Sequence, residues 1–294
     1  RVLNILEKDP SVDVTALFLR QNRNREMIRV FGSALAALFL SAVSALAVDW
    51  LQFRGPGGNA RSDDKGVPEK WSEKENVVWK TKLPGLGTSS PITVADAIFL
   101  TCYSGYGESV ESPGDQKDLV RHIVCLDRNT GAVRWAKEVK AALPGSPCKA
   151  GHGRWHGYAS SSPTSDGEHV YVFFGKTGVF CYDLKGKEKW TKAVGAGTTG
   201  WGSATSPLLY KNFVIVNASV EGGYVVALNK ATGKEEWKIS NIRSAWSSPI
   251  LVDVPGGITD AATGLPVQIF LWSDLPEGGF QAKTSAAVIV LLVF

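Results

Sequence analysis

Three segments of the sequence repeat one pattern, and this pattern restricts the fold more than any other feature. Each segment is an apolar stretch ending in Asp or Asn, a short turn with Gly, and a Trp four residues after that Gly. Asp, Asn and Thr side chains bind nearby backbone groups in turns, and Gly accepts a positive φ. The pattern predicts a β-hairpin whose second strand carries the Trp. The three sets are Asp127, Gly131 and Trp135; Asp183, Gly186 and Trp190; and Asn229, Gly233 and Trp237.

A second motif precedes the hairpins: two small hydroxyl residues, then Pro, then an apolar stretch. It occurs at 89–91, 161–163, 205–207 and 247–249. Pro at the start of a strand removes no ladder hydrogen bond. The two motifs in fixed order predict a four-stranded unit of about 40–50 residues, which is the period of a β-propeller blade. We therefore expect an all-β fold, an incomplete β-propeller with about four recognisable blades. Residues 103–121 and 141–158 are expected to be loops, the first of them exposed.

The first 47 residues have the character of an export signal. Arginines precede the apolar run Val30–Ala47, which ends in an A-x-A pattern, so we expect a cleaved secretory signal and translation starting at Met27. The alternative is an uncleaved membrane anchor. The expected organisation is upstream residues and signal at 1–47, repeat units at 48–254, and a divergent or truncated segment at 255–294. The protein is expected in the periplasm or outside the cell, with no stable membrane span after cleavage.

The repeat resembles the pyrroloquinoline-quinone (PQQ)-like β-propeller family, whose blade motif is close to A-x-D-x-x-T-G-x-x-x-W. The resemblance covers about residues 50–254, and the opening WLQFRGPGGN looks like the start of a bacterial secreted subgroup. It implies a binding or protein-interaction scaffold, similar to the outer-membrane assembly scaffold, with a protein partner or small ligand and no cofactor. A lipid-anchoring Cys after the cleavage site, which that scaffold has, is missing. The alternative implied is a PQQ- and Ca²⁺-dependent alcohol or sugar dehydrogenase, although the adjacent Cys pair common in those enzymes is absent.

Aromatic residues near the starts of the units are candidates for ligand binding. Trp155, Tyr158, Trp201 and Trp246 would cluster at one mouth of the central channel if each inner strand begins at the S-S-P motif. Aromatic side chains stack on sugars, quinones and peptide side chains, and they equally fill space between blades.

A metal site is a weaker candidate. Cys148, His152 and His156 are spaced four apart, which on a helix would place three ligands on one face. The surrounding Gly and Pro residues favour a loop instead, in which the histidines would bond to the backbone. His122 and His169 are expected to be structural.

Three further patterns have structural explanations. Gly195–Gly200 matches G-x-G-x-x-G, but no helix is expected after it, so we interpret it as a turn between units. Cys125 and Cys181 occupy the position of Ala227 in successive repeats, as buried small residues, and Cys102 with Cys125 is a candidate disulfide. The formal net charge is only +4 without a basic block, so no nucleic-acid partner is expected.

Overall fold

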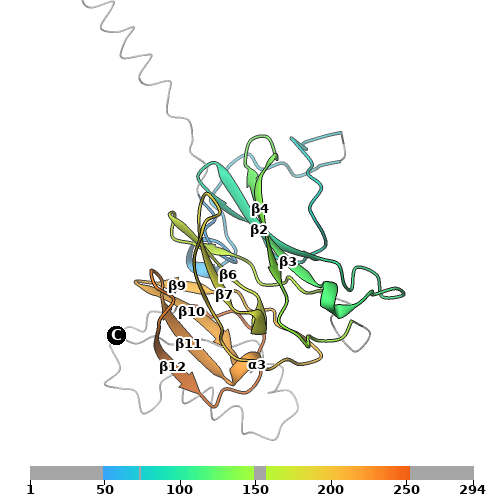
Figure 1. The fold of residues 1–294 in the computed structure, drawn as a ribbon. Coiled ribbons are helices and arrows are strands. Elements are labelled where there is room, and N and C mark those ends of the chain that lie inside the picture. The colour runs from blue at the N-terminus through green and yellow to red at the C-terminus, as the bar shows by residue number, and fades with distance from the viewer. Residues whose placement is uncertain (1–48, 73, 149–156, 252–294) are drawn as a thin grey trace, which may run out of the picture. The chain divides into compact units, whose positions relative to one another are not determined.

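The computed structural model describes residues 49–72, 74–148 and 157–251, which form three antiparallel sheets of four strands each (Figure 1). The first sheet contains β1 (Ile92–Val94), β2 (Ala97–Ser104), β3 (Val120–Asp127) and β4 (Val133–Lys140). The second contains β5 (Thr164–Ser165), β6 (His169–Phe173), β7 (Val179–Asp183) and β8 (Glu188–Lys192). The third contains β9 (Leu208–Tyr210), β10 (Phe213–Ala218), β11 (Tyr224–Asn229) and β12 (Glu235–Ser240). Strands lie in chain order within each sheet, so the all-β prediction and the four-stranded unit are confirmed for three units.

Helical structure in the described part is limited to short turns. They are η2 (Pro56–Gly58), η3 (Gln116–Asp118), η4 (Gly175–Thr177) and α3 (Ser219–Gly222). No helix in the described ranges has the length and apolar character needed to cross a membrane. The predicted export segment at 1–47 and the divergent segment at 255–294 lie outside the described residues.

Successive sheets pack face to face, and for this reason their inner strands are apolar on both sides. In β6, Val170 and Val172 pack against the first sheet, whereas Tyr171 and Phe173 pack against the third. Alternate residues of a strand point to opposite faces, so one strand serves two cores. Each such side chain contributes about 1.5–3 kcal/mol on full burial, which makes these interfaces the main source of stability.

Each sheet has the same irregularity opposite its Trp. Cys125 pairs with Trp135 and Cys181 pairs with Trp190, and the register shifts directly after each cysteine. The third sheet repeats this with Ala227 opposite Trp237. A small residue at this place leaves room for the neighbouring indole.

The structure corrects the predicted disulfide. Cys102 lies opposite His122, and Cys125 lies opposite Phe99. All four cysteines are free and buried. The prediction was wrong because it assumed that the two cysteines face each other, whereas the register of β2 and β3 separates them by three positions.

The loop predicted at 103–121 is shorter and less exposed than expected. Tyr103 and Arg121 pair with each other as members of β2 and β3, so the loop itself spans 105–119. Its two ends are held inside the fold, since Tyr106 and Leu119 are buried in a cluster with Cys148. The polar middle of the loop is where it reaches solvent.

Candidate functional site

The S-S-P motifs of neighbouring units are joined by hydrogen bonds. The backbone N–H of Ser90 donates to Oγ of Ser162 at 2.8 Å, and that of Ser162 donates to Oγ of Ser206 at 3.0 Å. The backbone N–H of Ser206 continues the series to Oγ of Ser248 at 2.9 Å. The motif therefore aligns the starts of consecutive units, and the loops around these starts come together.

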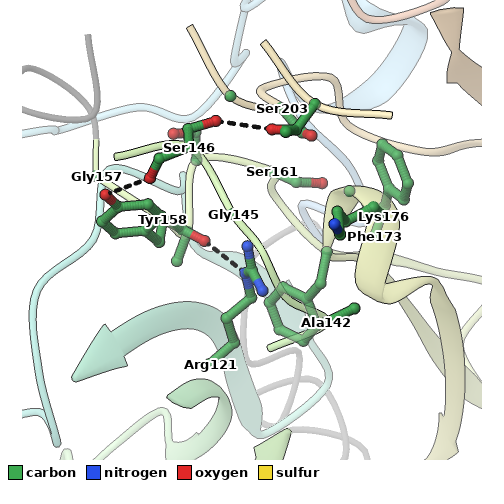
Figure 2. Close-up of a pocket in the computed structure, with 16 residues that line it drawn as sticks. Arg121, Ala142, Gly145, Ser146, Gly157, Tyr158, Ser161, Phe173, Lys176 and Ser203 are labelled. Carbon is green, nitrogen blue, oxygen red and sulfur yellow. Dashed lines mark hydrogen bonds between the residues drawn. The ribbon is translucent and has the colours of Figure 1, made fainter. Parts of the chain in front are cut away.

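A pocket forms beside this series of serines (Figure 2). Its wall combines the start of β3, the loop after β4, the residues before the second S-S-P motif, η4, and the loop after β8. The polar side chains that line it are Arg121, Ser146, Tyr158, Ser160, Ser161, Lys176, Thr198 and Ser203.

Arg121 supplies the main positive charge of the pocket. Its Nε donates to the carbonyl of Tyr158 at 2.9 Å, and its Nη1 donates to Oγ1 of Thr177 at 2.8 Å. Burial lowers the pKa of Arg121 to about 10, because a low-dielectric environment disfavours the charged form. The guanidinium is still protonated at neutral pH, since that pKa remains well above 7.

Glu221 places a buried carboxyl group behind the wall. This residue of α3 is only 4% exposed, and the hydroxyl of Ser203 donates to its Oε1. Burial raises the pKa of Glu221, and the Ser203 hydrogen bond and the charge of Arg121 oppose that rise. Gly197 of the G-x-G-x-x-G segment donates its N–H to the Glu221 carbonyl at 2.8 Å, within a connection between β8 and β9. That segment is thus part of an irregular connection between two sheets and is not followed by a helix, in agreement with the expected absence of a dinucleotide-binding helix there.

Hydroxyl groups complete the wall. The Tyr158 hydroxyl donates to the Ser146 carbonyl at 2.9 Å, and Oγ of Ser146 lies 2.8 Å from Oγ1 of Thr198. Burial raises the pKa of Tyr158, so its hydroxyl stays protonated and acts as a donor. Ser161 differs from the others, because its Oγ is buried and has no hydrogen-bond partner in the part of the chain that the structure describes.

The predicted aromatic candidates divide into two groups. Tyr158 packs edge-on against Tyr103, with ring centroids 5.2 Å apart, and lines the pocket. Trp201 and Trp246 form a separate pair, with centroids 6.2 Å apart. Trp246 Nε1 donates to the carbonyl of Gly202, another residue of the pocket wall, so the pair lies next to the pocket. Trp155 falls outside the described residues.

The predicted metal ligands are only partly described. Cys148 is buried, and its backbone N–H donates to the Tyr106 hydroxyl at 3.0 Å. His152 and His156 lie outside the described residues. Within the described ranges, no three His, Cys, Asp or Glu side chains gather as a metal site would require. Of the other histidines, His122 contacts Oγ of Ser104 through its Nε2 at 2.7 Å.

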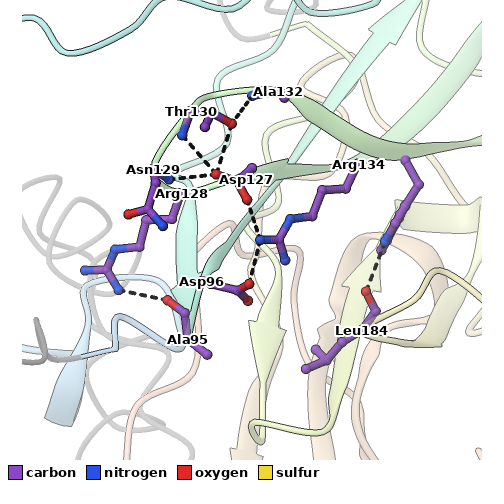
Figure 3. Close-up of polar contacts among 10 residues, drawn as sticks. Ala95, Asp96, Asp127, Arg128, Asn129, Thr130, Ala132, Arg134 and Leu184 are labelled. Carbon is purple, nitrogen blue, oxygen red and sulfur yellow. Dashed lines mark hydrogen bonds and ion pairs between the residues drawn. The ribbon is translucent and has the colours of Figure 1, made fainter.

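The repeat residues build the hairpin turns (Figure 3). Oδ1 of Asp127 accepts from the backbone N–H groups of Asn129 and Thr130 at 3.0 and 2.9 Å. Its other oxygen pairs with Arg134, which also contacts Asp96. Oδ1 of Asp183 and Oδ1 of Asn229 likewise accept from backbone N–H groups in their own turns.

Three tryptophans bind the turn of the unit that follows them in the chain. The indole N–H groups of Trp79, Trp135 and Trp190 donate to the carbonyls of Arg128, Leu184 and Lys230 at 3.1, 3.0 and 2.9 Å. A Cβ on Gly131, Gly186 or Gly233 would lie 2.4, 2.8 or 2.6 Å from the same indoles, and these glycines have φ of 71°, 82° and 71°. The turn therefore requires Gly for both its backbone conformation and its contact with the ring.

Sequence reasoning did not assign Arg121, Glu221 or Ser203 to a site. The sequence did contain a signal for two of them, because Arg121 and Glu221 are charged residues next to apolar strand residues. Such a position leaves little room for a charge. An isolated charge next to a buried strand is unusual unless it is paired or functional.

A family model described as outer membrane protein assembly factor BamB matches residues 73–256. Among curated proteins, no sequence matches the chain.

Several solved structures resemble the chain at low identity. BamB from Moraxella catarrhalis is 19% identical, with 57% of this chain and 44% of that chain covered and a TM-score of 0.38. Quinohemoprotein alcohol dehydrogenase from Comamonas testosteroni is 17% identical, with 68% and 28% covered and a TM-score of 0.45. A europium-containing methanol dehydrogenase is 19% identical, with 52% and 26% covered and a TM-score of 0.34. The chain spans less than half the length of each.

Proposed function

Because the chain belongs to the family described as outer membrane protein assembly factor BamB, we propose that it is an exported, non-enzymatic scaffold that binds a protein partner. The family match over residues 73–256 is the observation that carries this proposal. We further propose that the three sheets are blades of a β-propeller, with about four recognisable blades in residues 48–254. Export rests on the signal-like pattern in residues 1–47.

The surface beside the pocket supports a binding role. Trp201 is 50% exposed and is backed by Trp246. Trp and Tyr are enriched among the residues that contribute most to protein interfaces. The exposed middle of the loop at 105–119 offers a second contact region. We propose that a partner binds at these two regions.

The alternative is a quinoprotein oxidoreductase that uses PQQ with Ca²⁺. Arg121 and the pocket hydroxyls would suit an acidic cofactor, but Ca²⁺ takes 6–8 oxygen ligands, several of them carboxylates. Glu221, which borders the pocket, already accepts from Ser203, and the described residues form no acidic cluster there. The described residues therefore give this alternative less support than the scaffold, and we derive no reaction step through the quinone.

A paired experiment separates the two functions. A photo-reactive amino acid is placed at Trp201 in the full chain expressed in bacteria, and at Val133 as a control of similar exposure, 47%, on β4. We expect a cross-linked product of one defined mass from position 201 and none from position 133. Cross-linking at neither position, or equally at both, contradicts the proposed binding surface.

The second measurement is a PQQ titration of the purified full chain with and without Ca²⁺, followed by tryptophan fluorescence. A scaffold should show no saturable quenching in protein that circular dichroism shows to be folded. Saturable, Ca²⁺-dependent quenching would make the oxidoreductase the better assignment.

A further inference from the structure

Arg121 brings a positive charge to the pocket and forms no direct ion pair with a described residue. Among the described residues, no carboxylate oxygen lies within 4.0 Å of its guanidinium. Its two hydrogen-bond acceptors, the Tyr158 carbonyl and the Thr177 hydroxyl, are both neutral. These bonds use Nε and Nη1 and leave Nη2 for another acceptor. In Figure 2 the guanidinium lies at the pocket together with Tyr158.

Ser161 adds a second group that needs a partner. The residue is 4% exposed and lines the same pocket, and its Oγ has no hydrogen-bond partner among the described residues. A buried polar atom without a partner loses the hydrogen bonds that it would make to water. A buried guanidinium without a direct ion pair is also costly. Both costs fall if an acceptor enters the pocket, because a guanidinium donates only and a hydroxyl can donate.

Lys176 and Glu221 set the charge that an occupant meets. Lys176 lines the pocket, and its Nζ donates to the neutral carbonyl of Pro144 at 2.6 Å. Glu221 stands behind Ser203 and accepts from it. Two cations, Arg121 and Lys176, thus line the pocket, which favours an anion as its occupant.

We propose that this pocket binds a carboxylate group, with Arg121 as its cation and the Ser161 hydroxyl as a further donor. Arginine matches the planar carboxylate and forms charge-assisted hydrogen bonds about twice as strong as neutral ones. The carboxylate belongs either to a free small acid or to the C-terminus of a peptide. This assignment goes beyond the scaffold proposal and does not depend on it, since a pocket of this kind can serve a scaffold or an enzyme.

The test uses the full chain and calorimetric titration at constant ionic strength. The probes are sodium acetate, a short peptide with a free C-terminus, and the same peptide with an amidated C-terminus. We expect saturable binding of acetate or of the free-acid peptide, and at least about tenfold weaker binding of the amidated peptide. Tight acetate binding indicates a small acid, whereas peptide binding with weak acetate binding indicates a chain terminus. Failure of both carboxylate probes to bind overturns the proposal.

Three variants locate the site. Arg121→Gln should weaken the binding by about tenfold or more, and Ser161→Ala by about two- to tenfold. Arg128→Gln removes the same charge at a position that bonds to Ala95 outside the pocket, and should leave the affinity within about twofold of the wild type. Unchanged affinity in folded Arg121→Gln refutes the site. If that variant does not fold, unchanged affinity in Ser161→Ala refutes it instead. A failed cross-link at position 201 leaves these outcomes unaffected, so the two proposals can fail separately.

Discussion

Replacement of Trp190 by Ala should destabilise the protein by about 4 kcal/mol. Trp190 is 9% exposed, packs against Tyr171 at a centroid distance of 6.0 Å, and donates its indole N–H to the Lys230 carbonyl at 2.9 Å. A buried Trp removes about 200 Å² from water, which at about 25 cal/mol per Å² gives an upper value of about 5 kcal/mol. The Ala side chain still buries part of this area, which lowers the expected loss, whereas the lost hydrogen bond raises it by about 1 kcal/mol. The result of about 4 kcal/mol lies within the range of about 3–5 kcal/mol measured for Trp→Ala changes in protein cores.

Urea unfolding followed by far-ultraviolet circular dichroism measures this change. Trp201→Ala is the matched control, because its ring is 50% exposed, and it should cost less than about 1 kcal/mol. A loss below about 1 kcal/mol for Trp190→Ala would refute the assignment of this indole as the contact between consecutive units.

A double-mutant cycle with Gly233→Ala tests the contact itself. The new methyl group would lie 2.6 Å from the Trp190 ring, at a residue with φ of 71°. In the wild type it should cost the left-handed backbone penalty of about 1–2 kcal/mol plus the overlap with the ring. In the Trp190→Ala background the overlap is absent, so only the backbone penalty should remain. Simple additivity of the two changes would contradict the contact.

Three further outcomes are expected. Burial raises the pKa of the Cys125 thiol to about 11 and that of Cys181 to about 12, so both should resist alkylation by iodoacetamide at pH 8 in the native protein and react after unfolding, as mass spectrometry can show. Ser162→Ala removes the acceptor of the Ser90 N–H and should cost about 1–3 kcal/mol in urea unfolding; no change would mean that water replaces this bond. Backbone N–H groups lower the pKa of Asp183, so its contribution to stability is present above the unfolded pKa of about 3.9 and is lost as pH falls through the lower folded pKa. Asp183→Asn should therefore reduce the acid sensitivity of the unfolding midpoint between pH 5 and pH 2, and an unchanged profile would contradict this assignment.

The repeating hairpin could be predicted because its chemistry is local. Asp183, Gly186 and Trp190 lie within eight consecutive residues, and a turn of this type depends on nearby backbone groups. The S-S-P motif predicted the first strand of each unit for the same reason, because its effect on the backbone is also local. The family resemblance is confirmed by the family match, whereas the number of blades, the export signal and the C-terminal segment stay predictions.

The pocket could not be predicted, since it is built from five segments far apart in the sequence. Arg121 and Ser203 are separated by 82 positions and line the same cavity. The channel-mouth hypothesis named Tyr158, which lines the pocket, but it did not anticipate that Tyr158 would pack against other tyrosines and that Trp201 would pair with Trp246. The disulfide prediction failed because strand register is set by the packing of both faces, which no single strand reveals.

The contact between each indole and the next turn also gives the array a direction. Trp79 contacts Gly131, Trp135 contacts Gly186 and Trp190 contacts Gly233, so in these three contacts the ring comes from the earlier part of the chain and the glycine from the unit that follows. Two copies meeting through these surfaces would join head to tail and could not form a twofold-symmetric dimer. An open array would keep both surfaces exposed at its ends, so further copies could add without limit, as in a polar filament. In a closed ring these two surfaces would contact each other, and ring closure would then protect against polymerisation as well as against unfolding.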